Sequence, residues 1–200
     1  MFYARTWSFI HIPKTGGTNL YVCGSYFDDV FKANIDEQLV IENTLQKHNT
    51  IHYWKKYGNQ WYFDLPFAAV FNQPIYTIVR NPYSRLVSFW SHMQFQKHFT
   101  FEEFVKDKKT IHDYYPGNTQ HIDWDVFMPQ VDYIDDSVKV YKMETDMPEL
   151  EKSLGFPFAN HKAYVGNHSD YRLYYTDELQ ELVYNHFEPD FTTFGYSKDL

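Results

Sequence analysis

The chain has 200 residues, of which 26 are Asp or Glu and 18 are Lys or Arg, so its formal net charge is −8. This length suits a single domain with a substantial core, and we expect one domain over residues 1–200. The acidic balance argues against non-specific nucleic-acid binding and against a broad basic groove for a polyanionic glycan, but a local basic pocket is compatible with it.

Cysteine usage and apolar runs bear on the compartment. Cys23 is the single cysteine of the sequence, which excludes an intramolecular disulfide and fits a reducing compartment. No run of about 18 consecutive apolar residues occurs, and residues 1–13 lack a basic flank followed by a long apolar stretch. We therefore expect a soluble, cytoplasmic protein that does not bind membranes.

The first stretch that suggests chemistry is FIHIPKTGGTNL, residues 9–20. Its apolar, β-branched start predicts a buried strand that ends at Pro13, because proline has no N–H to give to a sheet ladder. Gly16 and Gly17 predict a turn in which backbone N–H groups can approach a ligand, with a helix beginning directly afterwards. A helix N-terminus beside the charge of Lys14 predicts a binding site for phosphate or sulfate.

The rest of the chain alternates between helix-like and strand-like patterns. Alternating strands and helices predict an α/β fold with an open parallel sheet flanked by helices, which binds its ligand at the carboxyl ends of the strands. In the first half of the chain we expect a helical part within 29–46, a short helix over 51–56, a helix or buried strand over 61–71, a strand over 75–79 and a helix over 83–96. A capping box at Thr100 and Glu103 predicts the start of another helix, and residues 110–130 predict an irregular excursion. Further on we expect a strand over 138–141, a helix over 149–154 that ends at Gly155, and a last long helix over 177–187 that Pro189 ends.

A second candidate site follows the strand expected over 75–79 and reads RNPYSRLVS, residues 80–88. Asn81 and Pro82 predict a helix cap and first turn. An arginine at a strand end can bind a phosphate through its forked donors, and Ser88 lies about 9 Å along a helix that begins at Pro82. Taken alone, the segment is equally compatible with a capped helix and solvent-facing arginines.

Both stretches resemble motifs of one enzyme family. Lys14 precedes the glycines, whereas a Walker A loop places its lysine after the last glycine. The PKTGGT loop resembles the 5′-phosphosulfate loop of sulfotransferases that use 3′-phosphoadenosine 5′-phosphosulfate (PAPS), in particular short bacterial carbohydrate sulfotransferases and heparan sulfate 2-O-sulfotransferase. Residues 80–88 resemble the 3′-phosphate motif of these enzymes, and residues 129–134, 138–144 and 190–196 extend the resemblance.

The resemblance implies the P-loop-like sheet of the PAPS sulfotransferase fold, with PAPS as donor, adenosine 3′,5′-bisphosphate (PAP) as product and no metal. It implies a catalytic role for Lys14, which would neutralise the leaving phosphate oxygen. Ser84 departs from the acidic residue that is common in the second motif. The implied nucleotide-binding residues are Lys14, Thr15, Gly16, Gly17, Thr18, Asn19, Arg80, Ser88 and Arg172.

The resemblance also implies a catalytic base. Residues 47–50 read KHNT and resemble a KHxT stretch of bacterial members, which implies that His48 removes the proton of the acceptor. His52 is the nearest rival, a carboxylate stays open as the base, and a purely helix-capping role is the alternative for His48. Because no third ligand accompanies His48 and His52, we expect no metal site.

These features predict a sulfotransferase that moves the sulfuryl group of PAPS to a hydroxyl of a carbohydrate or small-molecule acceptor by in-line displacement. Two alternatives stay open, namely a phosphoryl-transfer enzyme such as a kinase on a related fold and a catalytically inactive nucleotide-binding module. The sequence disfavours the kinase, because it lacks a Walker A loop and an evident acidic strand end for magnesium. The acceptor is expected to be recognised by segments that match no motif, residues 28–46, 57–74 and 97–127.

Overall fold

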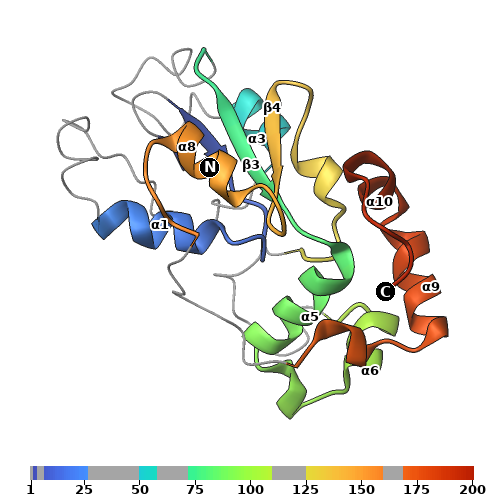
Figure 1. Cartoon of the computed structure of the whole chain (residues 1–200). Coiled ribbons are helices and arrows are strands. Elements are labelled where there is room, and N and C mark those ends of the chain that lie inside the picture. Colours follow the sequence, from blue (N-terminus) through green and yellow to red (C-terminus); the bar gives the residue numbers. More distant parts are fainter. Residues whose placement is uncertain (1, 4–6, 27–49, 58–71, 110–124, 160–168) are drawn as a thin grey trace.

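The computed structural model describes residues 2–3, 7–26, 50–57, 72–109, 125–159 and 169–200. Within them the chain forms an α/β fold with one sheet, whose strands lie in the order β1, β2, β3, β4 (Figure 1). The short β1 pairs antiparallel with β2, whereas β2, β3 and β4 are parallel, as the sequence predicts. The strands are β1 (Phe2–Tyr3), β2 (Ser8–Ile10), β3 (Ile75–Val79) and β4 (Val138–Lys142).

Helices flank this sheet on both faces and extend beyond one of its ends. In the part of the chain that the structure describes, the α-helices are α1 (Gly17–Tyr26), α3 (Ile51–Tyr57), α5 (Pro82–His92), α6 (Phe101–Lys106), α8 (Met147–Leu154), α9 (Asp177–His186) and α10 (Glu188–Phe194). The 3₁₀ helices of the described residues are η2 (Phe95–Lys97), η4 (Gln130–Tyr133) and η5 (Tyr171–Tyr174). None of the helices in the described ranges is both long and apolar enough to span a membrane.

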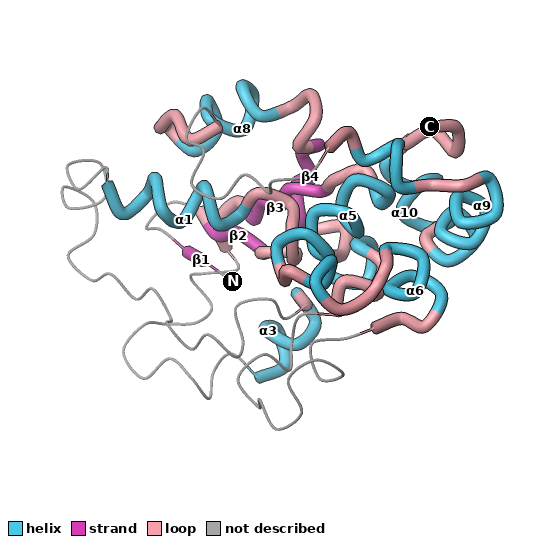
Figure 2. The backbone as a smooth tube through the Cα atoms, turned by 90° about the horizontal axis from the view of Figure 1, so that it is seen from below, coloured by secondary structure: helices cyan, strands magenta, loops and turns pink. Residues whose placement is uncertain are grey.

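The alternation of side chains along the strands separates two cores, one on each face of the sheet. Figure 2 shows α1 and α8 on one side of the strands and α3 on the other. Phe9 and Ile78 are buried with Leu20 of α1 and Leu150 of α8. On the opposite face, Ile51 of α3 is buried with strand residues that include Ile10, Ile75 and Val79. Burial on both faces explains why these strands read as nearly continuous apolar runs.

A third core lies among α5, α6, α9 and α10, on the side of the molecule reached by the chain as it leaves β3 (Figures 1 and 2). It is rich in aromatic rings, which touch edge to face or tilted, as between Trp90 and Phe101. Every side chain of α5 from Pro82 to Ser91 is buried. This helix is therefore the element around which the helical part of the protein packs.

Most predicted helix ends are confirmed. The Asn81 side chain accepts hydrogen bonds from the backbone N–H groups of the first turn of α5, and Thr100 and Glu103 form the expected capping box of α6. Gly155 ends α8 with a left-handed backbone at φ 85°. These boundaries depend on local side-chain chemistry, which is why the sequence predicts them well.

One predicted helix end is wrong, and the reason given for another is wrong. The helix expected over 83–96 ends at His92, because Gln94 adopts a left-handed backbone at φ 56° and the chain continues as η2. The helix expected over 177–187 is confirmed as α9, which ends at His186, but Pro189 does not end it. Pro189 lies in the first turn of the next helix, α10, where a missing N–H costs no hydrogen bond. The elements expected within 29–46, 61–71 and 110–124 lie outside the described residues.

Candidate functional site

The carboxyl ends of the three parallel strands meet at one edge of the sheet. Thr77 of β3 is paired with Ile10 of β2 and with Val140 of β4, so the strands advance together. Ligands of open parallel sheets bind outside this edge. The chain leaves the edge through residues 11–16 after β2, 80–81 after β3 and 143–146 after β4.

The loop after β2 is a tight turn that is stabilised from within. Thr15 is buried, and its Oγ1 donates a hydrogen bond of 3.0 Å to the carbonyl of Ile12. Lys14 and Gly16 have left-handed backbones, with φ of 65° and 92°. The N–H of Asn19 donates to the carbonyl of Gly16 at 2.9 Å as α1 begins. The hydroxyl of Thr15 and the N–H of Asn19 thus serve the turn itself.

The sequence predicts that Gly17 serves the turn, but the structure requires glycine there because a neighbouring side chain leaves no room. Gly16 needs its positive φ, but Gly17 is already part of α1. A Cβ atom at Gly17 would lie 2.2 Å from Cδ2 and 2.6 Å from Nε2 of His11, whose ring is buried under the loop. The close approach of this imidazole therefore excludes a side chain at Gly17, whatever its backbone angles.

Arg80 leaves the end of β3 and contacts the loop after β2. Its Nη1 donates to the carbonyl of Lys14 at 3.3 Å, and its Nε donates to Oγ of Ser84 at 2.8 Å. Burial lowers the pKa of the Arg80 guanidinium below its usual value, and the nearby carboxylate of Glu144 acts in the opposite direction. The guanidinium stays charged at neutral pH. The loop and the strand-end arginine, 66 residues apart in the sequence, are thus adjacent.

The second motif places Ser84, and not Ser88, against Arg80. Ser88 lies one turn further along α5 and is buried, with 6% of its surface exposed. Ser84 accepts the hydrogen bond from Arg80, although the sequence identified it only as a departure from the resembling motif. The four-residue spacing of Arg80 and Ser84 across a helix start was the signal that could have identified this contact.

Arg85 is a buried member of the site that the sequence interpretation did not assign to it. Its side chain is 1% exposed, its Nε donates to the carbonyl of Pro13 at 3.0 Å and its Nη1 donates to the carbonyl of Met128 at 3.1 Å. Its Nη2 is buried without a hydrogen-bond acceptor. Burial lowers the pKa of this guanidinium. The available signal was that Arg85 is the one charged residue of 82–91.

Gln130 and Asp190 support Arg80 from behind. The Gln130 side chain accepts from the N–H of Arg80 at 2.9 Å and donates to its carbonyl at 2.8 Å. Asp190 is fully buried and accepts hydrogen bonds from the backbone N–H of Gln130 at 2.9 Å and of Val131 at 3.0 Å. Burial raises the pKa of Asp190, while these N–H donors oppose the shift. The sequence linked residues 129–134 and 190–196 to the site only through their resemblance to the sulfotransferase family. In the structure these two segments contact each other beside Arg80.

The carboxylate of Glu144 lies at the carboxyl edge, directly after β4. Glu144 accepts a hydrogen bond from the N–H of Asn81 at 2.8 Å and another from the hydroxyl of Tyr196 at 2.9 Å. Burial, and then the charge of Glu144, raise the pKa of Tyr196. Lys142 lies over the Tyr196 ring with Nζ 5.1 Å from its centroid. Glu144 thus links the turn after β4 to the start of α5 and to the C-terminal segment.

Arg172 stands apart from these contacts. Its exposed side chain binds Asp170 through Nε at 2.9 Å and pairs with it through Nη2, which raises the pKa of Arg172. Asp170 also caps η5 by accepting from the backbone N–H of Arg172. Among the described contacts of Arg172, none reaches the loop after β2 or Arg80.

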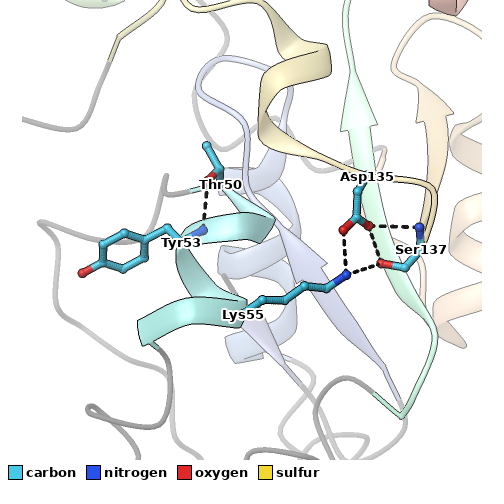
Figure 3. A network of polar contacts seen from close by, with 5 residues as sticks. All are labelled: Thr50, Tyr53, Lys55, Asp135 and Ser137. Atoms are coloured by element: carbon cyan, nitrogen blue, oxygen red, sulfur yellow. Dashed lines mark hydrogen bonds and ion pairs between the residues drawn. The ribbon is translucent and has the colours of Figure 1, made fainter.

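The predicted catalytic base, His48, lies outside the described residues. Two residues later, the Oγ1 of Thr50 accepts from the N–H of Tyr53 at 3.1 Å and caps α3, so this helix needs no histidine as its cap (Figure 3). His52, the rival candidate, is exposed on α3. His11 is buried, with its ring close to Gly17.

A separate polar network ties α3 to the opposite end of the sheet. Nζ of Lys55 pairs with Oδ2 of Asp135 at 2.6 Å and donates to Oγ of Ser137 at 3.2 Å (Figure 3). Asp135 and Ser137 directly precede β4, so this network lies at the amino end of the strand. It does not contribute side chains to the carboxyl edge.

The chemistry available at the carboxyl edge is anion binding. The ten-residue helix α1 begins at this edge and directs its N-terminal N–H groups and positive dipole end toward it. Lys14 and Arg80 are both positively charged, and Arg80 contacts the backbone carbonyl of Lys14. In the part of the chain that the structure describes, no group of three or more His, Cys, Asp or Glu side chains is arranged to hold a metal ion.

Comparisons with protein-family models, with curated proteins and with solved structures give no match to this chain.

Proposed function

We propose that this protein is a PAPS-dependent sulfotransferase with a P-loop-like sheet, which transfers the sulfuryl group to a hydroxyl of a carbohydrate or small-molecule acceptor. One observation carries the proposal: Nη1 of Arg80 lies 3.3 Å from the carbonyl of Lys14, at the carboxyl edge of a parallel sheet. The two motifs that resemble the 5′- and 3′-phosphate sites of these enzymes are thus neighbours. Their adjacency suits a nucleotide that carries phosphates on two positions of one ribose.

The charges of the site fit such a nucleotide. Within the described residues, Arg80 forms no ion pair with a carboxylate, because its side-chain partners are a carbonyl and a hydroxyl. Because both partners are neutral, no ion pair neutralises the guanidinium, and its charge can attract an anionic ligand. Arg80, with Ser88 on the same helix unit, would bind the 3′-phosphate, and the loop of Lys14 to Thr18 would bind the 5′-phosphate. Arg172 would need a rotation away from Asp170 to join them.

The chain's own groups would perform three tasks in the reaction. PAPS, when bound, supplies an activated sulfuryl group, and the acceptor oxygen attacks its sulfur as the phosphate oxygen leaves with growing negative charge. Lys14 and the loop N–H groups would stabilise this charge, as donors fixed in advance of the reaction. His48 would take the proton of the acceptor hydroxyl.

Transfer from labelled PAPS to a panel of sugar and small-hydroxyl acceptors tests the proposal. We expect wild-type protein to label at least one acceptor class without added metal. His48→Ala should lower the transfer rate by about 10²–10⁴-fold, the usual contribution of a general base, while PAP affinity stays close to wild type. His52→Ala is the matched control and should retain transfer.

Two results would change the assignment. If His48→Ala retains turnover and His52→Ala does not, the base is His52 and the sulfotransferase proposal stands. If the wild type transfers to no acceptor and binds PAP no better than adenosine, the proposed function is wrong.

A further inference from the structure

Two arginines of one strand–helix unit bind two consecutive carbonyls of the loop after β2. Nε of Arg85 donates to the carbonyl of Pro13 at 3.0 Å, and Nη1 of Arg80 donates to the carbonyl of Lys14 at 3.3 Å. These carbonyls belong to the peptide groups on either side of Lys14. The orientation of both peptide groups is therefore set from β3 and α5, not by the loop alone.

The carbonyl orientation determines the direction of the N–H groups. In a planar trans peptide the C=O and N–H bonds point in opposite directions, and the described backbone contains no cis peptide. Because the carbonyls of Pro13 and Lys14 point toward the guanidinium groups, the N–H groups of Lys14 and Thr15 point the other way. A rotation of either peptide group would present a carbonyl oxygen where an N–H now lies, and that oxygen would repel an anion.

The backbone between these two peptide groups is strained. Lys14 has a backbone φ of 65°, in a region that residues other than Gly, Asn and Asp seldom occupy. Such conformations persist when the surrounding structure imposes them, and they concentrate at ligand sites. The hydrogen bonds to the carbonyls on both sides of Lys14 are contacts that impose this conformation.

Burial of the Arg85 guanidinium costs desolvation free energy, and packing alone does not explain why a charged side chain lies there. The guanidinium is fully buried, it forms no ion pair within the described residues, and its Nη2 lacks an acceptor. A buried charge of this kind is seldom more stable than an apolar side chain of similar size. Its second bond, to the carbonyl of Met128, joins the loop to the segment in which Gln130 holds the backbone of Arg80. Arg85 thus connects the two halves of the site.

We propose that Arg85 is a positioning residue that orients the peptide groups around Lys14, so that the N–H groups of Lys14 and Thr15 face the 5′-phosphate of the bound nucleotide. This inference rests on the proposed function. It assigns Arg85 no contact with the nucleotide. Its effect should therefore appear only in the part of the affinity that the 5′-phosphate supplies.

Calorimetric titration with two nucleotides measures the part of the affinity that the 5′-phosphate supplies. PAP carries both phosphates, whereas adenosine 3′-monophosphate lacks the 5′-phosphate, so the ratio of their dissociation constants reports the contribution of the loop. We expect Arg85→Lys to weaken PAP binding by about tenfold or more, the effect of one lost hydrogen bond to a charged group, and to change the affinity for adenosine 3′-monophosphate by less than about twofold. Lys55→Ala, which removes the ion pair at the opposite end of the sheet, is the control and should leave the ratio unchanged.

Each outcome has a distinct meaning. If the wild type binds PAP and Arg85→Lys weakens both nucleotides equally, or neither, the positioning role is wrong while the nucleotide site stands. If the wild type binds neither nucleotide, the proposed function itself fails. Should Arg85→Lys not fold, amide NMR of the wild type decides: PAP must shift the Lys14 and Thr15 signals much more than adenosine 3′-monophosphate does, and equal shifts would overturn the inference.

Discussion

The two ends of the parallel sheet carry polar networks of opposite character. At the amino end, Lys55 pairs with Asp135 on the surface, with 41% of the lysine side chain exposed (Figure 3). At the carboxyl end, Arg85 is 1% exposed and Asp190 is fully buried. Arg85 donates to backbone carbonyls, and Asp190 accepts from backbone N–H groups and from the side-chain amide of Gln130. One network is an ion pair in water, and the other lies inside the protein.

The difference separates a surface contact from contacts that fix the geometry of the carboxyl edge. An exposed ion pair contributes little to the free energy of folding, and its desolvation costs little. Its presence is therefore no indication of a ligand site. Buried charged groups are expensive, and their cost is accepted where they fix a geometry that apolar side chains cannot fix. The buried charged groups Arg85 and Asp190 lie at the carboxyl edge. Parallel sheets bind their ligands at this edge. Substitutions at the two ends should therefore have unequal effects.

The largest effect is expected from Arg85→Ala. The substitution leaves the buried carbonyls of Pro13 and Met128 without donors and opens a cavity under the loop. We expect the free energy of unfolding to fall by about 3–5 kcal/mol. Urea denaturation followed by circular dichroism measures it. A loss below about 1 kcal/mol would place the buried network in the same class as a surface pair.

Gly17→Ala should come next. The new methyl group would overlap the ring of His11, so we expect a loss of about 2–3 kcal/mol from overpacking. A double-mutant cycle with His11→Ala identifies the cause, since removing the ring makes room for the methyl group. The double variant must then be more stable than the sum of the two single effects predicts. Additive effects would mean that the close approach to His11 does not determine the need for glycine.

Asp190→Asn tests the acceptor behind Arg80. The amide nitrogen of asparagine cannot accept the hydrogen bonds that Gln130 and Val131 donate, and we expect a loss of about 1–2 kcal/mol. The pH dependence has a defined sign. Because burial raises the folded pKa of Asp190 above 3.8, its protonation stabilises the folded state, and this contribution is complete below pH 3.8 and is lost as the pH rises through the folded pKa. Stability curves of wild type and variant should therefore diverge on acidification; parallel curves would contradict the shift.

The smallest effect is expected from Lys55→Ala. The variant removes the contacts with Asp135 and Ser137 at the amino end of β4, but all three groups have access to water. The free energy of unfolding should change by less than about 1 kcal/mol, and PAP affinity should not change. The same denaturation and titration experiments measure both. A clear loss of nucleotide affinity would show that the amino end is coupled to the site.

The sequence predicts much of the scaffold. Residues 75–79 read as a buried parallel strand because their side chains are apolar on both faces, and Asn81, Thr100 and Gly155 predict helix ends because capping involves neighbouring residues only. The adjacency of the glycine loop and Arg80 also follows from sequence, since parallel strands bring their carboxyl ends to one edge. Each of these features depends on local patterns or on a general rule of sheet topology.

The details of the site depend on tertiary contacts that no local pattern encodes. Arg85 meets Pro13 across 72 residues, and Gln130 meets Asp190 across 60, so neither pair has a spacing to recognise. The clash that makes Gly17 necessary arises from the ring of His11, and no sequence spacing pairs these two residues. Periodicity reports which side of an element is buried, but not which polar atoms meet there.

Titration calorimetry with PAP, in buffer that contains EDTA, tests the central claim most directly. If the carboxyl edge is a site for a nucleotide with 3′- and 5′-phosphates, PAP binds without metal, Arg80→Ala weakens the binding by at least about tenfold, and ATP with magnesium does not compete. Binding of ATP that requires magnesium, with no heat from PAP, would contradict the account and favour phosphoryl transfer instead.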